Sequence, residues 1–206
     1  MMKYLIGGIV FVLVALGAYY AWDMFGTTAA PTPPPPPAAP TISTYATTTF
    51  SISYPSNYML DEEYTYDAFE GKPISGVKFA VPASLTDGTN LSSDSGVSIE
   101  WLPRAQSCTG DIYVLANVRA VDMTVGSTTY SVATSSDAGA GNLYEEMVYA
   151  IEGSKPCTAV RYFIHSSNIS NFPAEGEEGA VREFDRAALL RQFDSIRDAL
   201  VLNLTP

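Results

Sequence analysis

The segment Phe50–Pro55, with the sequence FSISYP, alternates apolar and polar residues and ends at a proline. A period of two is typical of a strand that buries one face. The same alternation recurs at Val77–Val81 and at Val97–Trp101, and a loop rich in Gly, Ser, Asn and Asp separates these two segments. Further strands are predicted at residues 143–151 and 159–166. We therefore expect an antiparallel sheet.

Two turns and a helix complete the expected secondary structure. Gly126–Ser127 lies at the centre of residues 123–132, which predicts a tight hairpin, and the glycine-bearing segment Asp137–Asn142 predicts a turn. We interpret the ambiguous segment Ser107–Arg119 as helical. Asp185 can cap a C-terminal amphipathic helix. The apolar residues of that helix recur at helical spacing: Leu189, Phe193, Ile196 and Leu200. An antiparallel sheet packed with helices is an α+β fold.

The opening segment resembles the start of PsbP-like domains when it is extended to Tyr58. That start reads F-x-I-x-Y-P-x-x-W/Y, and the final helix, Asp185–Leu200, also suits the α/β/α sandwich of that family. Position 58 is tyrosine where tryptophan is frequent in the family, and a disulfide is not a general family feature. The resemblance implies an α/β/α sandwich that serves as a non-enzymatic accessory or binding domain. It offers no catalytic residues to carry over.

Residues 4–22 form an almost uninterrupted apolar run without a charged side chain. As a helix the run spans about 28 Å, close to the bilayer hydrocarbon core of about 30 Å. Lys3 precedes it and Asp23 follows it, so the positive-inside bias places the N-terminus in the cytoplasm. A cleaved signal peptide is the alternative, although its apolar region is usually only about 7–15 residues long. We predict a single transmembrane helix within residues 1–26, in the cell membrane, that exports the rest of the chain.

A proline-rich linker, residues 27–43, follows the predicted anchor. Consecutive prolines at Pro33–Pro37 favour polyproline II, which makes a stiff spacer. A PxxP ligand for an SH3-like domain is the alternative, but no basic residue flanks these prolines. Residues 44–206 are enough for one extracytoplasmic α+β domain with a core of its own.

Charge and cysteine content restrict what this domain does. The chain carries 22 acidic and 11 basic residues, a net charge of −11, which repels the phosphates of nucleic acids and excludes them as partners. Cys108 and Cys157 are its only cysteines. In an oxidising compartment two such residues predict a disulfide, with two free buried thiols as the alternative. Closing a loop of this length contributes about 4 kcal/mol in the chain-entropy model.

Catalytic and metal-binding signatures are weak. His165 is the only histidine, and the chain contains no G-x-S-x-G motif. The segment 137–142 differs from a phosphate-binding loop because an acidic strand follows it, not a helix. One histidine and two bridged cysteines leave too few ligands for zinc. Two acidic clusters lack EF-hand spacing, and we interpret them as solvated charge: Asp61-Glu62-Glu63, and Glu175 with Glu177 and Glu178. We expect no metal and no cofactor.

The candidate ligand-binding residues are His165, Asn168, Asn171 and Phe172, together with Asn142. Amides, a ring and a histidine on loops suit a recognition surface, and an ordinary connecting loop is the alternative. The leading hypothesis is a membrane-tethered extracytoplasmic binding or accessory domain, without enzymatic activity, for an unknown envelope protein or ligand. An inert structural module of a larger envelope complex is a further possibility.

An envelope hydrolase is the alternative function. It would use His165 and a carboxylate such as Glu145. Across a hairpin with a loop of about five residues, Glu145 and Arg161 would also lie near one another and form a modest surface pair.

Overall fold

The computed structural model describes residues 41–203, which belong to one unit that runs from Pro40 to Pro206. The predicted anchor, residues 4–22, and nearly all of the predicted linker lie outside the described residues. No helix in the described part of the chain has the length and apolar character that a bilayer crossing requires.

The strands form two sheets in which every pair is antiparallel. The small sheet has the order β1-β2-β11, with β1 at Ile42–Ala46, β2 at Phe50–Pro55 and β11 at Val201–Leu202. The large sheet has the order β3-β5-β6-β10-β9-β8-β7, and β4 also pairs with β5. Its strands are β3 (Met59–Asp61), β4 (Thr65–Tyr66), β5 (Ile74–Ala80), β6 (Gly96–Leu102), β7 (Val121–Val125), β8 (Thr128–Gly139), β9 (Asn142–Ile151) and β10 (Cys157–Ser167).

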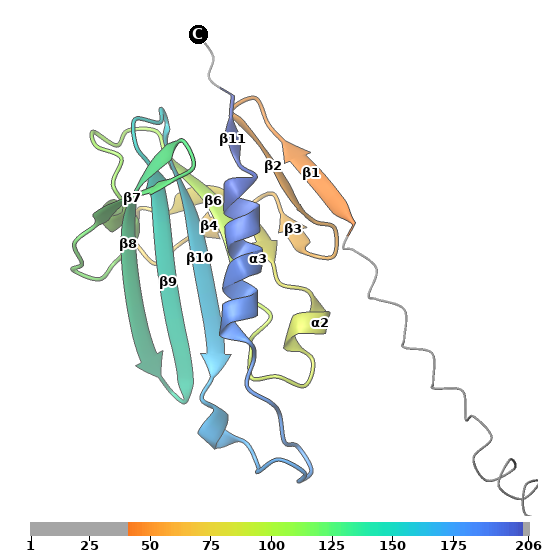
Figure 1. Ribbon diagram of the computed structural model, residues 1–206. Helices are drawn as coiled ribbons and strands as arrows, with labels where there is room; N and C mark the ends of the chain where they lie inside the picture. Colours follow the sequence, from red (N-terminus) through yellow and green to blue (C-terminus); the bar gives the residue numbers. More distant parts are fainter. Residues whose placement is uncertain (1–40, 204–206) are drawn as a thin grey trace, which may run out of the picture. The chain divides into compact units, whose positions relative to one another are not determined.

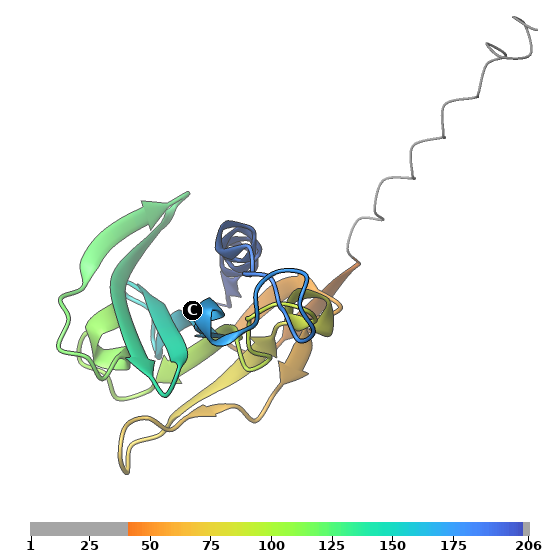
Figure 2. The same ribbon diagram turned by 90° about the horizontal axis from the view of Figure 1, so that it is seen from below.

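Two α-helices and two 3-10 turns are present in the described residues. They are α2 (Ala83–Thr86), α3 (Arg186–Asp198), η1 (Gly110–Tyr113) and η2 (Ile169–Asn171). The predicted cap of α3 is confirmed, because Asp185 Oδ1 accepts a hydrogen bond from the backbone N–H of Ala188 at 2.8 Å. The large sheet curves, and α3 lies on its concave side (Figures 1 and 2).

The main hydrophobic core lies between the concave face of the large sheet, α3 and β2. Alternation along β6 and β10 turns one set of side chains toward the helix. That set meets the apolar stripe of α3 and the inward residues of β2 in one continuous cluster. The central buried members are Phe50, Ile52, Val97, Ile99, Val160, Tyr162, Ile164, Leu189, Phe193 and Ile196.

The opposite face of the large sheet is covered by the irregular segment 103–120. A second cluster packs there around Tyr113, Val148 and Ala159. The predicted disulfide between Cys108 and Cys157 is confirmed, and it ties this segment to β10. Tyr113 is fully buried, and its hydroxyl donates a hydrogen bond to the carbonyl of Cys157 at 2.7 Å.

The expected α/β/α sandwich is wrong. The fold is mostly antiparallel sheet, with one long helix on one face and an irregular segment, not a helical layer, on the other. The helical interpretation of Ser107–Arg119 is wrong for the same reason, since only the short turn η1 forms there. Gly110 brings its backbone directly onto the sheet, where a Cβ would lie 2.6 Å from the backbone nitrogen of Ala133. Because Cys108 is also bonded to the sheet, this segment lies flat against it.

The predicted turns and strands are largely confirmed. Gly126–Ser127 joins β7 to β8, and Gly126 has φ +60°. The turn predicted in residues 137–142 is confined to Ala140 and Gly141, with φ +50° and +84°. Positive φ at both positions is the requirement of a type I′ hairpin. The predicted strands correspond to β2, β5, β6, β9 and β10, whereas β1 and β11 were not expected.

Candidate functional site

A groove of about 600 Å³ opens on the face of the large sheet that is turned away from α3. Strands β8, β9 and β10 supply its floor, and residues 66–68 and 115–116 supply its walls. Its volume lies within the range of about 300–1,000 Å³ that is usual for small-molecule sites. The side chains with chemistry to offer are Tyr66, Leu115, Asp137, Tyr144, Glu146 and Phe163.

The strand register brings the floor residues together. Glu146 on β9 lies opposite Phe163 on β10, and Tyr144 lies opposite His165. Side chains of directly opposite residues share one face of the sheet. The rings of Tyr144 and Phe163 are stacked with their centroids 6.4 Å apart, so the floor carries an aromatic surface next to a carboxylate.

A buried ion pair lies beside this floor on the same face of the sheet, since Arg161 and Phe163 are two positions apart on β10. The side chains of Arg161 and Glu100 are both 0 % exposed, and Arg161 donates two hydrogen bonds to Glu100 at 2.7 and 2.9 Å. It donates a third to the carbonyl of Tyr113 at 2.7 Å. Burial alone lowers the pKa of Arg161, but the hydrogen bond to Glu100 and the charges of Glu100, Glu146 and Tyr66 together raise this pKa above its ordinary value. The guanidinium therefore stays charged.

Glu146 connects the buried pair to the groove. Its Oε2 accepts a hydrogen bond from Arg161 at 3.0 Å, and its Oε1 accepts one from the hydroxyl of Tyr66 at 2.9 Å. Burial raises the pKa of Tyr66, so this hydroxyl keeps its proton and acts as the donor. The Arg161 guanidinium also lies 3.6 Å from the centre of the Tyr66 ring. The carboxylate is thus held in one orientation from two sides.

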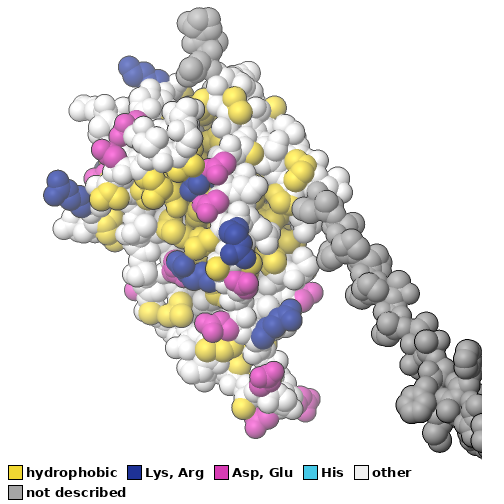
Figure 3. Space-filling model, viewed as in Figure 1, with side chains coloured by type: hydrophobic (Ala, Val, Ile, Leu, Met, Phe, Trp, Pro, Cys, Tyr) yellow, Lys and Arg dark blue, Asp and Glu magenta, His cyan; other side chains and the backbone are white. Residues whose placement is uncertain are grey.

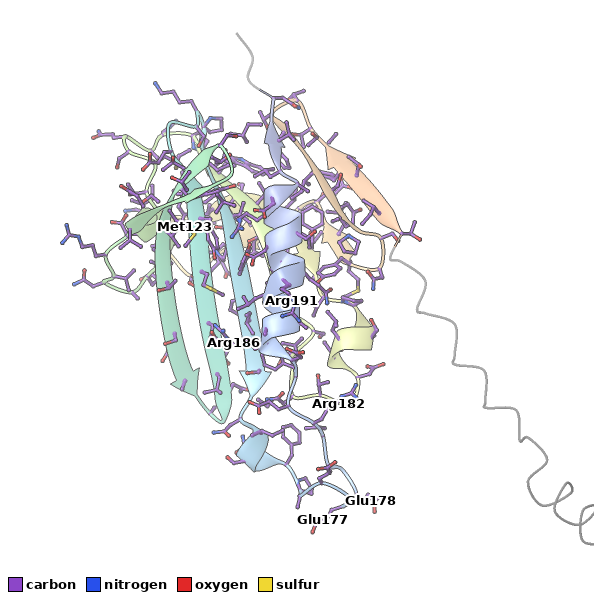
Figure 4. All side chains as sticks on the ribbon, in the orientation of Figure 1. Met123, Glu177, Glu178, Arg182, Arg186 and Arg191 are labelled. Atoms are coloured by element: carbon purple, nitrogen blue, oxygen red, sulfur yellow. A yellow bond between two sulfur atoms is a disulfide. The ribbon has the colours of Figure 1, made fainter. Side chains whose placement is uncertain are left out.

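The predicted pair of Glu145 and Arg161 is wrong. Arg161 lies opposite Val148, and Glu145 lies opposite Ile164. A five-residue loop, 152–156, would place Glu145 opposite Phe163, one residue from the observed register, and a shift of one residue turns a side chain to the other face. Glu145 consequently faces α3, where its Oε1 accepts a hydrogen bond from Nε of Arg186 at 3.0 Å (Figure 4 labels Arg186).

One ring nitrogen of His165 pairs with a carboxylate, and the other ring nitrogen is buried. Its Nδ1 lies 2.8 Å from Asp94 Oδ1, and its ring stacks on Tyr144 at 4.6 Å. Nε2 is buried and has no hydrogen-bond partner within residues 41–203. The neighbouring Ser95 hydroxyl binds the main chain of His165. The hydrolase hypothesis needs Nε2 next to a hydroxyl or a substrate, and this geometry does not offer it.

Three of the predicted ligand-binding amides lie together at one end of the sheet. The side chain of Asn171 donates a hydrogen bond to the carbonyl of Gly141 at 2.9 Å, and Asn142 accepts one from the hydroxyl of Ser167 at 3.3 Å. Asn168 accepts one from the backbone N–H of Ser170 and so caps η2. These amides join the β8–β9 turn to the end of β10, and their assignment to a ligand site stays a prediction.

The other predicted site residues are more dispersed. Phe172 follows η2 and is half-buried, while His165 lies on β10 with its side chain 18 % exposed. Glu177 and Glu178 project from the loop that precedes α3 (Figure 4). In the part of the chain that the structure describes, no group of three His, Cys, Asp or Glu side chains is arranged to hold a metal ion.

A second groove, of about 760 Å³, runs between α3 and the small sheet. Tyr54, Leu85, Arg191 and Ile196 are among the residues that line it. Figure 3 shows this side of the molecule, where hydrophobic side chains gather on both sides of α3 and charged ones lie along the helix. This groove lacks the combination of stacked rings and an oriented carboxylate that distinguishes the groove on the other face.

Sequence reasoning did not identify Tyr144, Glu146 and Phe163 as site residues. A signal was present, since Tyr144 and Glu146 are two positions apart on a predicted strand and must share a face. The alternation along one strand does not reveal its partner strand or the register between the two. That register places Phe163 and Arg161 beside Tyr144 and Glu146.

No protein-family model and no curated protein matches the chain. Among solved structures, one from Bacteroides thetaiotaomicron VPI-5482, determined at 1.50 Å resolution, is similar over 74 % of this chain with 12 % sequence identity and a TM-score of 0.38. The similarity covers 44 % of that protein, so the chain spans less than half of its length. A likeness this distant carries no argument about function. The resemblance to PsbP-like domains stays a prediction.

Proposed function

We propose that the protein is a membrane-tethered, extracytoplasmic binding domain, and that its ligand occupies the groove on β8, β9 and β10. The observation that carries the proposal is the floor of this groove, where a carboxylate held in one orientation lies beside stacked aromatic rings. Binding sites commonly combine apolar surface with a few placed polar groups.

The site is prepared for binding before a ligand arrives. Tyr144, Glu146 and Phe163 belong to strands, and strands hold side chains more precisely than loops do. Glu146 is fixed by Tyr66 and Arg161, so little side-chain freedom remains to be lost. Recognition through such a site costs less ordering entropy than recognition through a flexible loop.

The predicted anchor and spacer support the cellular part of the proposal. A transmembrane helix at residues 4–22 followed by a stiff linker would hold the domain at a distance from the membrane surface. A recognition role suits a tethered domain, because tethering raises the effective concentration of a site near its membrane.

Photo-crosslinking in intact cells tests the proposal. A benzophenone amino acid replaces Leu115, which is 62 % exposed at the wall of the groove. The same amino acid at Met59, which is 57 % exposed on β3, is the matched control. After irradiation, mass spectrometry of the intact protein detects any covalent adduct, whether small molecule or protein.

We expect an adduct at position 115, none at position 59, and loss of the adduct when Tyr144→Ala removes the ring from the groove floor. Equal adducts at both positions would refute the proposal. An adduct at position 115 that persists unchanged in Tyr144→Ala would also refute it, since the ligand would then bind outside the groove.

A further inference from the structure

We propose that the ligand of this groove is an organic cation, a primary ammonium or guanidinium group on an aliphatic chain, with Glu146 as its counter-ion. The inference rests on the proposed function, because it names the ligand class of the same groove. It follows from the charges, hydrogen bonds and rings that surround Glu146.

The charges next to the groove floor do not cancel. Arg161 is the guanidinium partner of two carboxylates, Glu100 and Glu146. Glu100 accepts two hydrogen bonds from Arg161, at 2.7 and 2.9 Å, and both side chains are fully buried, so we count these two as a neutral pair. Glu146 is the second carboxylate that pairs with the Arg161 guanidinium. Its side chain is 15 % exposed and lines the groove. One negative charge is left over where a ligand would lie.

Lys78 on β5 is a second basic side chain on this face, and its Nζ lies 5.2 Å from the centre of the Phe163 ring. Its Nζ donates a hydrogen bond to the backbone carbonyl of Asp94 at 2.6 Å and does not line the groove. Burial lowers the pKa of Lys78, and the charge of Asp94 acts against that shift. Within residues 41–203, the ten residues that line the groove include Asp137 and Glu146 and no lysine or arginine.

Glu146 has acceptor capacity that no other side chain within residues 41–203 uses. A carboxylate offers about four lone-pair positions, and Tyr66 and Arg161 each take one. An ammonium group offers up to three N–H donors and a guanidinium group up to five in its plane, and neither group has an acceptor, so either can fill the remaining positions. A charge-assisted hydrogen bond to such a group is about twice as strong as a neutral one.

The rings of the groove favour the same ligand. Aromatic faces attract cations, and this side of the sheet already contains three such contacts, one of them between Lys78 and Tyr64. Arg161 lies 3.6 Å from the Tyr66 centroid, and the Lys78 Nζ lies 5.2 Å from the Phe163 centroid. Tyr144 stacks on both Phe163 and His165, and these two rings are themselves 6.4 Å apart, so the three rings form one aromatic cluster on the floor. The aliphatic chain of the ligand would pack on these rings while its charged end reaches Glu146.

Isothermal titration calorimetry tests the inference with the full-length chain in a non-ionic detergent. The cationic probes are agmatine, cadaverine and the peptide acetyl-Gly-Lys-Gly-amide, which separates a free amine from a lysine in a polypeptide. Cellobiose is the neutral probe and glutarate the anionic one. We expect heat of binding with at least one cation, none with glutarate, and weaker binding as NaCl is added.

Two neighbouring carboxylates of β9 supply a matched pair of variants. Glu146→Gln should weaken binding of the cation by about tenfold or more, which is the effect of losing one hydrogen bond to a charged group. Glu145→Gln removes the same charge one residue away, on the face toward α3, and should change the affinity less than twofold. Asp137→Asn, at an exposed position on the groove rim, should weaken binding without risk to folding.

The possible results separate the ligand class from the binding function. Absence of heat with all three cations overturns the inference, and so does a Glu146→Gln variant that binds them as tightly as the native chain. If cellobiose alone binds, and Tyr144→Ala abolishes its binding, the groove is a binding site and only the cationic ligand is wrong. Loss of affinity in both Asp137→Asn and Glu146→Gln, with Glu145→Gln unchanged, supports the inference even if one variant is less stable.

Discussion

The variant Arg161→Met tests whether the buried ion pair stabilises the large sheet. In the native protein Arg161 joins β10 to Glu100 of β6 and to Glu146 of β9, and neither Arg161 nor Glu100 is exposed to solvent. Methionine fills much of the same volume but leaves Glu100 with a hydrogen bond from Ser98 alone. An uncompensated buried carboxylate costs about 3–5 kcal/mol, a large part of the roughly 5–15 kcal/mol of a typical domain.

Urea unfolding followed by far-UV circular dichroism measures this loss, because the free energy of unfolding falls linearly with urea concentration. The double variant Arg161→Met/Glu100→Gln removes both charges together. We expect it to be more stable than Arg161→Met, since no unpaired buried charge remains. Arg186→Met is the control, because its pair with Glu145 is solvent-exposed and should contribute about 1 kcal/mol or less.

The reasoning is refuted if Arg161→Met loses less than about 1 kcal/mol, a loss no larger than that of an exposed pair. It is also refuted if the double variant is no more stable than the single one. In either case the buried carboxylate would not be the source of the destabilisation.

Three further predictions concern stability. Replacing Cys108 and Cys157 by serine should cost about 4 kcal/mol in urea unfolding, since the disulfide closes a loop with a separation of 49 residues. Ala140→Asn should stabilise the protein by about 0.5–1 kcal/mol, seen as a higher Tm, because asparagine tolerates positive φ better than alanine. Burial raises the pKa values of Tyr66 and Tyr162 above the ordinary value, so the unfolded chain loses these protons first. The free energy of unfolding should therefore keep its full value below about pH 10 and fall as the pH rises above it. Thermal melts between about pH 8 and pH 11 would record this as a falling Tm.

Each of these predictions has a result that contradicts it. Equal unfolding midpoints for the native and serine variants would show that the disulfide contributes nothing. A lower Tm for Ala140→Asn would mean that its side chain meets an obstacle in the turn. A Tm that stays constant to pH 11, with phenolate absorbance appearing in the folded protein, would mean that the tyrosines ionise without opposing burial.

Local patterns predicted the elements that depend on local chemistry. The alternation of Phe50–Pro55 identified β2, Gly126–Ser127 identified a hairpin, and the Asp185 cap and apolar spacing identified α3. These signals lie within a few residues of one another, so the sequence contains them complete. The disulfide was predictable because only one pairing of two cysteines exists.

Features that depend on distant partners were missed. The register of β9 against β10 decides whether Glu145 or Glu146 meets Arg161, and a loop-length argument misplaced it by one residue. Residues 103–120 follow the sheet because Gly110 and Cys108 attach them to it, and neither constraint has a local pattern. Strand β11 has two residues, too few to show a period.

The small sheet determines how the described domain would carry a mechanical load. Strands β1 and β11 both run antiparallel to β2, so the chain enters this sheet beside Pro55 and leaves it beside Phe50. A pull between these two ends acts along the strands and across their hydrogen bonds, which lie perpendicular to the strands. The five residue pairs of β1 and β2 then resist in shear together, and do not open one after another. A tether that begins at Ile42 would therefore load all five pairs at once, and β1 would have to come free of β2 as a unit.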